Sequence, residues 1–174
     1  DLDEVTPGNY TIQISPIEVE DMDPGDGADC GSQDRRLRKR TLNKVFLSAL
    51  GDAVARPAEV KLDSFPLELE LEGYSPNHIR IYLYNATRRP GGRPSREVKI
   101  QLTGLPGQLP GQRTNLDNSG EHFVLLAGYE VEKKVFILWD AGTYSDIVYS
   151  RSLTVKSITV MNAWLSGLSE EGKR

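Results

Sequence analysis

Two apolar segments late in the chain place the strongest limit on its fold. "HFVLLAGYE", residues 122–130, and "KVFILWDAG", residues 134–142, are nearly uninterrupted apolar runs joined through the short polar link "VEKK". Apolar runs of this length, rich in β-branched and aromatic residues, are typical of buried strands. They predict a hairpin that forms the most buried part of the protein.

A second pair of segments alternates between apolar and other residues, which is the pattern of strands with one face in the core. The first is "HIRIYLYNAT", residues 78–87, and the second is "EVKIQLTG", residues 97–104. Between the two patterns lies a stretch rich in arginine, glycine and proline, Ala86 to Arg96, here called the arginine loop. We expect the two strands to pair as a hairpin with this loop as their long connection.

The whole pattern predicts an α+β protein. Its simplest form is a curved antiparallel sheet or a partly open β-barrel (a pseudobarrel) with flanking helices, one near each end of the sequence. The other expected elements are a strand over residues 10–19, a helix capped by Asp34 that ends near Val54, a strand over 67–71, a strand over 153–158 and a helix over 159–168.

Charge is distributed unevenly along the 174 residues. The net charge is −4, but residues 1–29 contain nine acidic and no basic residues, so the remainder carries +5. Two clusters, Gly31–Lys44 and Arg80–Lys99, each hold six basic residues against one acidic residue. A charged run is often only a solvated face, but an acidic leader ahead of two basic clusters favours contact with nucleic acid.

Cysteine and histidine are too scarce for several kinds of site. Cys30 is the single cysteine, which excludes an internal disulfide framework and a thiolate zinc site, and only two histidines are present. We therefore expect no metal and no cofactor. The sequence shows no signal segment and no apolar run of about eighteen residues. It is expected to be a cytoplasmic domain cut from a longer protein.

A catalytic alternative rests on three residues. Glu97-Val98-Lys99 has the Glu-x-Lys form of many restriction nucleases, in which carboxylates hold a divalent cation and the lysine assists the attacking water. Asp63 would supply the second carboxylate from one strand upstream. The pattern is short, and the sequence after Lys99 leads into "GLPGQLPG" rather than into an amphipathic helix. A metal-dependent nuclease therefore stays the alternative to a binding domain.

Three polar segments hold the candidate DNA-binding residues. Arginine binds phosphates or guanine edges, short polar side chains hydrogen-bond to bases, and tyrosine stacks on them. The segments are the start of the first helix, the arginine loop with its root, and "TYSDIVYSRS", residues 143–152. The candidates are Arg35, Arg38, Lys39, Arg40, Asn85, Thr87, Arg88, Arg89, Arg93, Arg96, Tyr144, Ser145, Tyr149, Ser150 and Arg151.

From about Ile79 to Leu165 the sequence resembles a domain attached to prokaryotic restriction enzymes and methylation-linked defence proteins. In that family we expect an aliphatic-aromatic strand ending in Asn-x-Thr, a Gly/Arg-rich loop, an acidic-x-basic-Ile-Gln strand, and the motifs VF-x-x-WD and YS-x-S-x-x-V. The matching residues are Asn85, Thr87, Gly91, Gly92, Arg93, Glu97, Ile100, Gln101, Val135, Phe136, Trp139, Asp140, Tyr149, Ser150, Ser152 and Val155. The resemblance implies a pseudobarrel that recognises duplex DNA or a modified base.

We therefore expect a non-catalytic target-recognition domain of a prokaryotic restriction system, which binds double-stranded DNA in a sequence- or modification-specific way. A flipped modified base would stack on Tyr144, Tyr149 or Trp139. The expected division is an acidic strand and loop over residues 1–33 and a single α+β DNA-recognition domain over 34–174. Its partners would be DNA and further domains or subunits of a restriction enzyme, with no membrane. A protein-interaction module of a restriction complex is the third possibility.

Overall fold

The computed structural model describes residues 9–13, 36–75, 77–88, 97–103, 105, 108–114, 116, 122–141, 147–148, 150–167 and 170–172. The division expected between residues 33 and 34 lies outside these ranges. The elements in chain order are β1 (Asn9–Gln13), α1 (Lys39–Leu50), the short 3-10 helix η1 (Gly51–Ala53), β2 (Val54–Ala55), the 3-10 helix η2 (Pro57–Glu59), β3 (Leu67–Leu71), β4 (His78–Asn85), β5 (Thr87–Arg88), β6 (Glu97–Leu102), β7 (Arg113–Thr114), β8 (Phe123–Glu130), β9 (Val135–Asp140), β10 (Ile147–Val148), β11 (Arg151–Lys156), α2 (Ser157–Ser166) and β12 (Glu170–Gly172).

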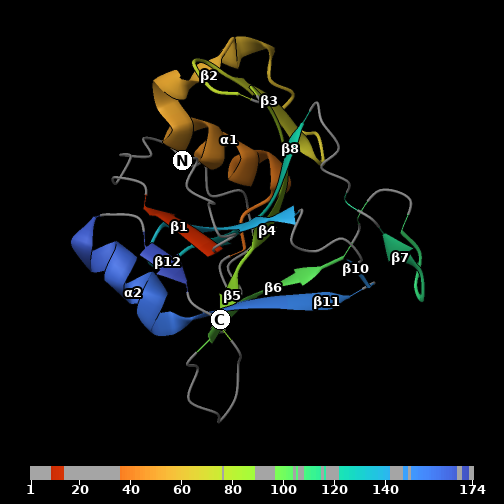
Figure 1. The fold of residues 1–174 in the computed structure, drawn as a ribbon, viewed down its shortest axis with the longest axis vertical. Coiled ribbons are helices and arrows are strands. Elements are labelled where there is room, and N and C mark those ends of the chain that lie inside the picture. Colours follow the sequence, from red (N-terminus) through yellow and green to blue (C-terminus); the bar gives the residue numbers. More distant parts are fainter. Residues whose placement is uncertain are drawn as a thin grey trace, which may run out of the picture.

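Seven strands form the large sheet, in the order β12-β1-β9-β8-β4-β3-β2 (Figure 1). Neighbouring strands are antiparallel except β4 and β8, which run parallel from Ile79 opposite Phe123 to Asn85 opposite Tyr129. The sheet has two edges, β12 and β2, and is therefore open rather than closed into a barrel. The predicted α+β class with a mostly antiparallel, open sheet is confirmed.

A second sheet of three strands, here called the small sheet, has the order β11-β6-β5 and lies below the large sheet in Figure 1. Its main ladder pairs β6 with β11 over six residues, from Leu102 opposite Arg151 to Glu97 opposite Lys156. β5 adds a two-residue edge to β6. A separate two-stranded ribbon pairs β7 with β10.

The central strands β8 and β9 are apolar along almost their whole length because both of their faces are covered. On one face α1 packs Leu42 and Phe46 into the core, where the Phe46 and Phe136 rings meet edge-on at 4.9 Å between centroids. On the other face the small sheet packs Ile100 against a second core cluster that includes Trp139. The predicted buried hairpin is confirmed, and its two covered faces explain why neither strand alternates.

Gly128 on β8 makes room for the small sheet. A Cβ atom at this position would lie 2.5 Å from Cγ2 of Ile100 and 3.4 Å from the ring of Trp139. Trp139 itself is 1% exposed and belongs to the core between the two sheets. The expectation that a flipped base stacks on Trp139 is therefore wrong, because packing covers the ring on both sides.

The predicted hairpin between residues 78–87 and 97–104 is also wrong. β4 pairs with β3 and β8 in the large sheet, whereas β6 pairs with β5 and β11 in the small sheet. The chain changes layer after β4: Ala86 still donates its N–H to the Tyr129 carbonyl (2.8 Å), and Thr87 already lies opposite Lys99. Alternation identifies a strand but not its partner, since partners are chosen by contacts distant in sequence.

The helix expected from Asp34 to Val54 is shorter than predicted at its described ends. Arg38 is the N-cap and is extended (φ −64°, ψ 151°), so the helix starts at Lys39; Asp34 lies outside the described residues. The helix stops at Leu50 because the C-cap glycine has a φ of 53°. Within the described ranges neither α1 nor α2 has the length and apolar composition of a membrane span, and no other helix there has them.

Candidate nucleic-acid interface

The side chain of Asn85, at the end of β4, joins the two basic clusters of the sequence. Its Nδ2 donates to the carbonyl of Leu37 (3.0 Å) and its Oδ1 accepts from the N–H of Leu37 (2.8 Å). These bonds hold the segment before α1 against the end of β4. Leu37 stands between Arg36 and Arg38, and Asn85 stands three residues before Arg88. Basic segments 48 positions apart in sequence are thereby brought together.

The basic residues at the start of α1 have different surroundings. Arg36 and Arg38 are exposed. The Nζ atom of Lys39 stands 3.4 Å from the centroid of the Phe65 ring. Desolvation by this partial burial lowers the pKa of Lys39. Lys39 thus contacts the rest of the protein, whereas Arg36 and Arg38 project into solvent.

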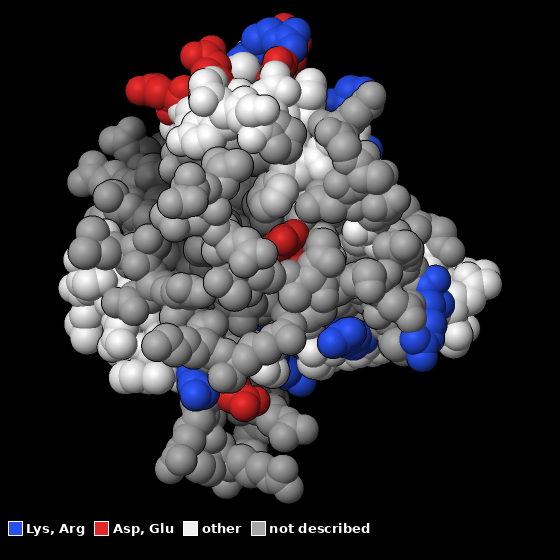
Figure 2. Space-filling view, in the orientation of Figure 1, with Lys and Arg blue, Asp and Glu red and all other residues white. Residues whose placement is uncertain are grey.

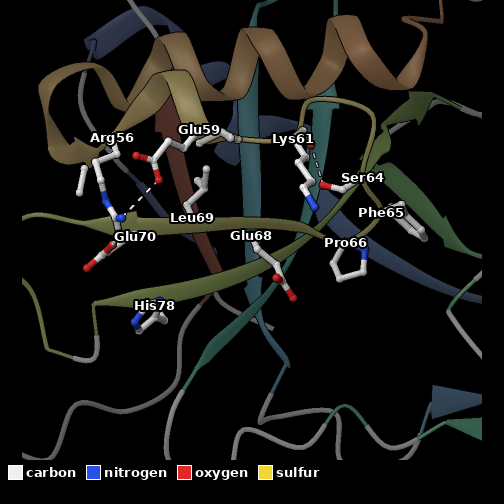
Figure 3. Close-up of a pocket in the computed structure, with 12 residues that line it drawn as sticks. Arg56, Glu59, Lys61, Ser64, Phe65, Pro66, Glu68, Leu69, Glu70 and His78 are labelled. Atoms are coloured by element: carbon white, nitrogen blue, oxygen red, sulfur yellow. Dashed lines mark hydrogen bonds and ion pairs between the residues drawn. The ribbon is translucent and has the colours of Figure 1, made fainter.

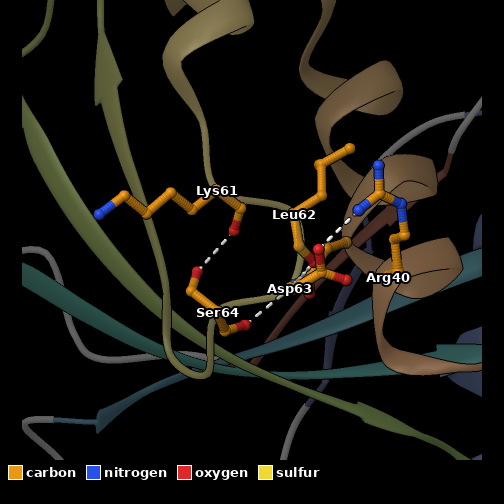
Figure 4. A network of polar contacts seen from close by, with 6 residues as sticks. Arg40, Lys61, Leu62, Asp63 and Ser64 are labelled. Carbon is orange, nitrogen blue, oxygen red and sulfur yellow. Dashed lines mark hydrogen bonds and ion pairs between the residues drawn. The ribbon is translucent and has the colours of Figure 1, made fainter.

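Arg40 is tied to the loop between η2 and β3 (Figure 4). Its Nη1 lies 2.5 Å from Oδ2 of Asp63, and both side chains are largely exposed. Asn43 is buried and fixes this loop, because its Nδ2 donates to the carbonyls of Leu62 (2.8 Å) and Ser64 (3.0 Å). Of the candidate cations, Arg40 therefore has a carboxylate partner of its own.

The small sheet has one apolar and one polar face. On the apolar face Val98, Ile100 and Leu102 are fully buried. Residues directly opposite each other in an antiparallel pair share a face, so the other face holds three cross-strand rows. The rows are Thr87–Lys99–Thr154, Gln101–Ser152 and Glu97–Lys156.

These seven polar side chains are here called the outer face. Of them, only Thr87 was among the DNA-binding candidates. The alternation of "EVKIQL" and "LTVK" already marks the others as outward-facing positions, so a signal for them was present in the sequence. The sequence did not show that β6 pairs with β11, and this pairing places the outward residues of both strands side by side.

Gln101 organises the start of β11 through its amide. Its Nε2 donates to the carbonyl (2.5 Å) and the hydroxyl (2.6 Å) of Ser150, and its Oε1 accepts from the hydroxyl of Ser152 (3.3 Å). Ser150 has a left-handed φ of 66°, a conformation that costs about 1 kcal/mol or more for a residue other than glycine. The Gln101 amide offsets part of that cost. The candidate residues Ser150 and Arg151 are thereby held at one end of the β6–β11 ladder.

The β7–β10 ribbon lies beside this end of the ladder, as Figure 1 shows, and it contributes a further basic residue. Val148 lies opposite Arg113, and Arg113 is exposed. β10 precedes β11 directly in the chain, so the ribbon extends the edge at which Arg151 begins the strand. Arg113 was not among the sequence candidates, because "GQRTNL" has no pattern that marks it.

Several candidates fall in parts of the chain that the structure does not describe. Of Arg88 only the backbone is described, as part of β5. The candidates outside the described residues are Arg35, Arg89, Arg93, Arg96, Tyr144, Ser145 and Tyr149. Their roles in DNA binding stay predictions.

Charge is distributed unevenly over the face drawn in Figure 2. Blue side chains predominate over the region of the small sheet and β7, whereas red and blue are mixed at the top, in the region of β2 and β3. Lys99 and Lys156 on the outer face have no ion-pair partner among the described residues, although Glu97 shares a row with Lys156. The small sheet therefore carries the less compensated positive charge.

A cavity of about 500 Å³ opens beside η2 and β3 (Figure 3). Three of its charged lining residues are paired with one another: Arg56 lies 3.2 Å from Glu59 and also binds Glu70. The hydrogen bond between Arg56 and Glu70 raises the pKa of Arg56 and lowers the pKa of Glu70. Arg80 pairs with Glu68 at 2.9 Å on the neighbouring strands. This region has mixed charge, most of it paired, and does not continue the basic surface.

The structure does not assemble the residues of the nuclease alternative. Asp63 lies in the loop before β3 as the partner of Arg40, whereas Glu97 and Lys99 lie on β6 in the small sheet. Three strands, β3, β4 and β5, lie between Asp63 and Glu97 in the chain, not one as expected. In the part of the chain that is described, no group of three His, Cys, Asp or Glu side chains is placed to hold a metal ion.

The fold and this surface define an α+β domain with an open sheet and a basic, polar second layer. Residues 77–174 match the Methylase-associated X1 family (MTaX1), and since the match covers more than half of the chain, the chain belongs to this family. Membership links it to methylase- and restriction-associated proteins, which agrees with the resemblance found in the sequence. The match contains the whole small sheet, whereas α1, β2 and β3 precede it. No curated protein and no solved structure matches the chain significantly.

Proposed function

We propose that this chain is a non-catalytic module that binds double-stranded DNA within a restriction-modification-related system. The observation that carries the proposal is the junction at Asn85, which brings two basic segments to one place although they are far apart in sequence. Family membership supports the setting, since a methylase-associated domain belongs to a system that acts on DNA.

Phosphate contacts account for the affinity in this proposal. The two clusters around the junction each hold six basic residues against one acidic residue. Cations gathered on one surface release counterions from duplex DNA when they bind, which makes the affinity fall steeply with salt. Arg38 and the arginines of the arginine loop are the proposed phosphate anchors, and Thr87 with the Tyr144–Arg151 segment faces the bases. Asn85 acts as a positioning residue, because its amide is already bonded to Leu37.

Fluorescence anisotropy on unmodified and methylated duplexes, with and without Mg²⁺, tests the proposal. We expect binding that weakens at least about a hundredfold between about 50 and about 200 mM salt, without cleavage of the DNA. A preference between the two duplex pools would show that the chain recognises a modification. Absence of binding at any salt concentration would overturn the proposal.

Two asparagines provide a matched pair of variants. Asn85→Ala and Asn43→Ala each remove a side chain that makes two hydrogen bonds to backbone groups. Asn85→Ala releases the two basic segments from each other and should lower duplex affinity about tenfold. Asn43→Ala releases only the loop around Asp63 and should not weaken duplex binding. Equal affinities for the two variants would contradict the role of the junction.

A second candidate function, contact with another subunit, is favoured by α2. Ile158 is 61% exposed and Leu165 is 70% exposed, and their seven-residue spacing places them on one side of the helix. An exposed apolar patch on one side of a helix is a candidate surface for contact with a partner. If α2 binds the methylase, Leu165→Glu should abolish co-purification with that enzyme and leave DNA affinity unchanged. Retained co-purification would exclude this use of α2.

A further inference from the structure

We propose that the outer face of the small sheet enters the major groove of the duplex and reads base edges there. This inference rests on the proposed function and deepens it. The basic clusters supply affinity that is independent of sequence, whereas the outer face supplies the choice of site. The size of the small sheet, the chemistry of its three rows and the hydrogen bonds of Gln101 support this role.

The dimensions of the β6–β11 ladder suit the major groove. Six residue pairs make a ribbon about 20 Å long, and its two strands lie about 4.8 Å apart. The major groove is about 12 Å wide and admits a two-stranded ribbon. β5 extends the sheet by only two residues, opposite Val98 and Lys99, so it does not widen the ladder along its whole length.

The rows of the outer face carry the groups that base edges require. Lys99 donates to guanine acceptors, and the hydroxyl of Thr154 in the same row donates or accepts. Glu97 accepts from the amino group of cytosine and lies opposite Lys156. Successive rows are about 7 Å apart along a strand, which equals about two base-pair steps.

The chemical groups of the outer face favour binding to duplex DNA over binding to a single strand. Single-stranded nucleic acid is held chiefly by aromatic side chains on which the bases stack. Among the described residues, the outer face has hydroxyl, amide, amine and carboxylate groups and no aromatic ring. The large aromatic side chains described on the neighbouring strands, such as Trp139 and Tyr82, are buried in the core between the sheets.

Gln101 has a different role from its neighbours in this arrangement. Its Nε2 and Oε1 are both bonded within the protein, to Ser150 and Ser152. It is therefore a positioning residue that sets the start of β11 and the direction of Arg151. The outer-face residues that face the bases are Thr87, Glu97, Lys99 and Thr154.

Selection of bound duplexes from a randomised pool tests this inference, with the wild type, Lys99→Met and Thr154→Val compared. Both variants keep the length or shape of the side chain and suit a strand, and a thermal melt checks that they fold. We expect the wild type to enrich a site and each variant to lose about tenfold in preference at one or two neighbouring base pairs. Lys61→Met is the matched control, because Lys61 is exposed in the loop before β3 and belongs to no row of the outer face.

The outcomes separate this inference from the proposed function. Salt-sensitive duplex binding with a site preference that both variants retain would overturn the groove-reading role and leave the DNA-binding proposal intact. Binding without any site preference in the wild type would do the same. Failure of the wild type to bind any duplex would overturn both. Lost preference in Lys99→Met and Thr154→Val, but not in Lys61→Met, is the result that supports the inference.

Discussion

The loops around η2, before residue 77, and the outer face of the small sheet, after it, differ in whether their cations are paired with carboxylates. Before residue 77, Arg40 and Arg56 have carboxylate partners in the same part of the structure. After it, Lys99 and Lys156 stand on the outer face without an ion pair among the described residues. Ion pairs within the fold neutralise a surface, whereas uncompensated cations are left for an external anion.

This difference indicates that the two parts of the chain have different structural roles. The earlier part supplies α1, which covers one face of the large sheet, and the later part supplies the small sheet, which covers the other. Both layers bury apolar residues, and the small sheet combines its buried face with an outer face whose two lysines have no ion pair among the described residues. The Asn85–Leu37 junction then adds the start of α1 to the surface of the later part.

The largest expected effect concerns the contact between the two sheets. Gly128→Ala places a methyl group against Ile100 and should lower the free energy of unfolding by about 2 to 3 kcal/mol, measured by urea denaturation. Combining it with Ile100→Ala removes the clash, so the double variant should lose less than the sum of the single losses. Strict additivity would mean that the two layers do not meet at this point.

Asn43→Ala should lower the free energy of unfolding by about 2 kcal/mol, because it leaves the carbonyls of Leu62 and Ser64 without their donor in a buried site. Asn85→Ala should cost about 1 kcal/mol, since Asn85 is only partly buried. Thermal melts of both variants measure the order. The reverse order would show that the junction, rather than the loop beside α1, is the stronger tie.

Alkaline pH should lower the free energy of unfolding through Tyr82 and Tyr84, which pack in the core between the two sheets. Burial raises the pKa of Tyr84 and of Tyr82 above the ordinary value of 10.0. The unfolded chain therefore loses these protons first, so their stabilising contribution is complete below pH 10 and is lost as the pH rises further. The midpoint of urea unfolding should fall between about pH 9 and about pH 11.

Tyr84→Phe tests the source of this pH dependence, because it removes the ionisable group and its hydrogen bond to the Thr103 carbonyl (3.2 Å). The variant should show a smaller alkaline fall than the wild type. Tyr74→Phe is the control, since Tyr74 is 62% exposed outside both cores. A fall that is the same in all three proteins would assign it to other groups.

The smallest expected effect tests the paired charges of the earlier part. Asp63→Asn removes the carboxylate that holds Arg40 and should change the free energy of unfolding by less than about 1 kcal/mol, as for other exposed ion pairs. It should raise duplex affinity about twofold at low salt, because Arg40 becomes available to phosphate. Unchanged affinity in the anisotropy assay would place Arg40 outside the DNA contact and confine that contact to the later part.

Local pattern was sufficient for the elements whose surroundings are simple. The apolar runs of β8 and β9 identified the buried hairpin, and the alternation of β6 identified a strand with one face in the core. The start of α1 was misjudged, because the extended Arg38 precedes the helix without a side-chain cap. The charge clusters also followed from the sequence, since counting charges needs no coordinates.

Local sequence pattern predicted only some of the residues of the candidate site. Thr87 and Arg151 were named from their residue types, but Lys99 was assigned to a nuclease and Thr154 was not considered. Lys99 and Thr154 belong to one row of the outer face because β11 pairs with β6. That pairing joins segments about fifty residues apart, and a periodic pattern carries no information on which distant strand is the neighbour.

The sequence by itself determined the class of the fold, the buried hairpin and the presence of two basic clusters, because apolar periodicity and net charge are local properties. The tertiary structure alone decided that β4 and β6 lie in different sheets, that Trp139 is enclosed, and that Asn85 holds Leu37. Each of these depends on which surfaces pack together to bury the most apolar area with satisfied hydrogen bonds. That choice is made by the whole chain at once.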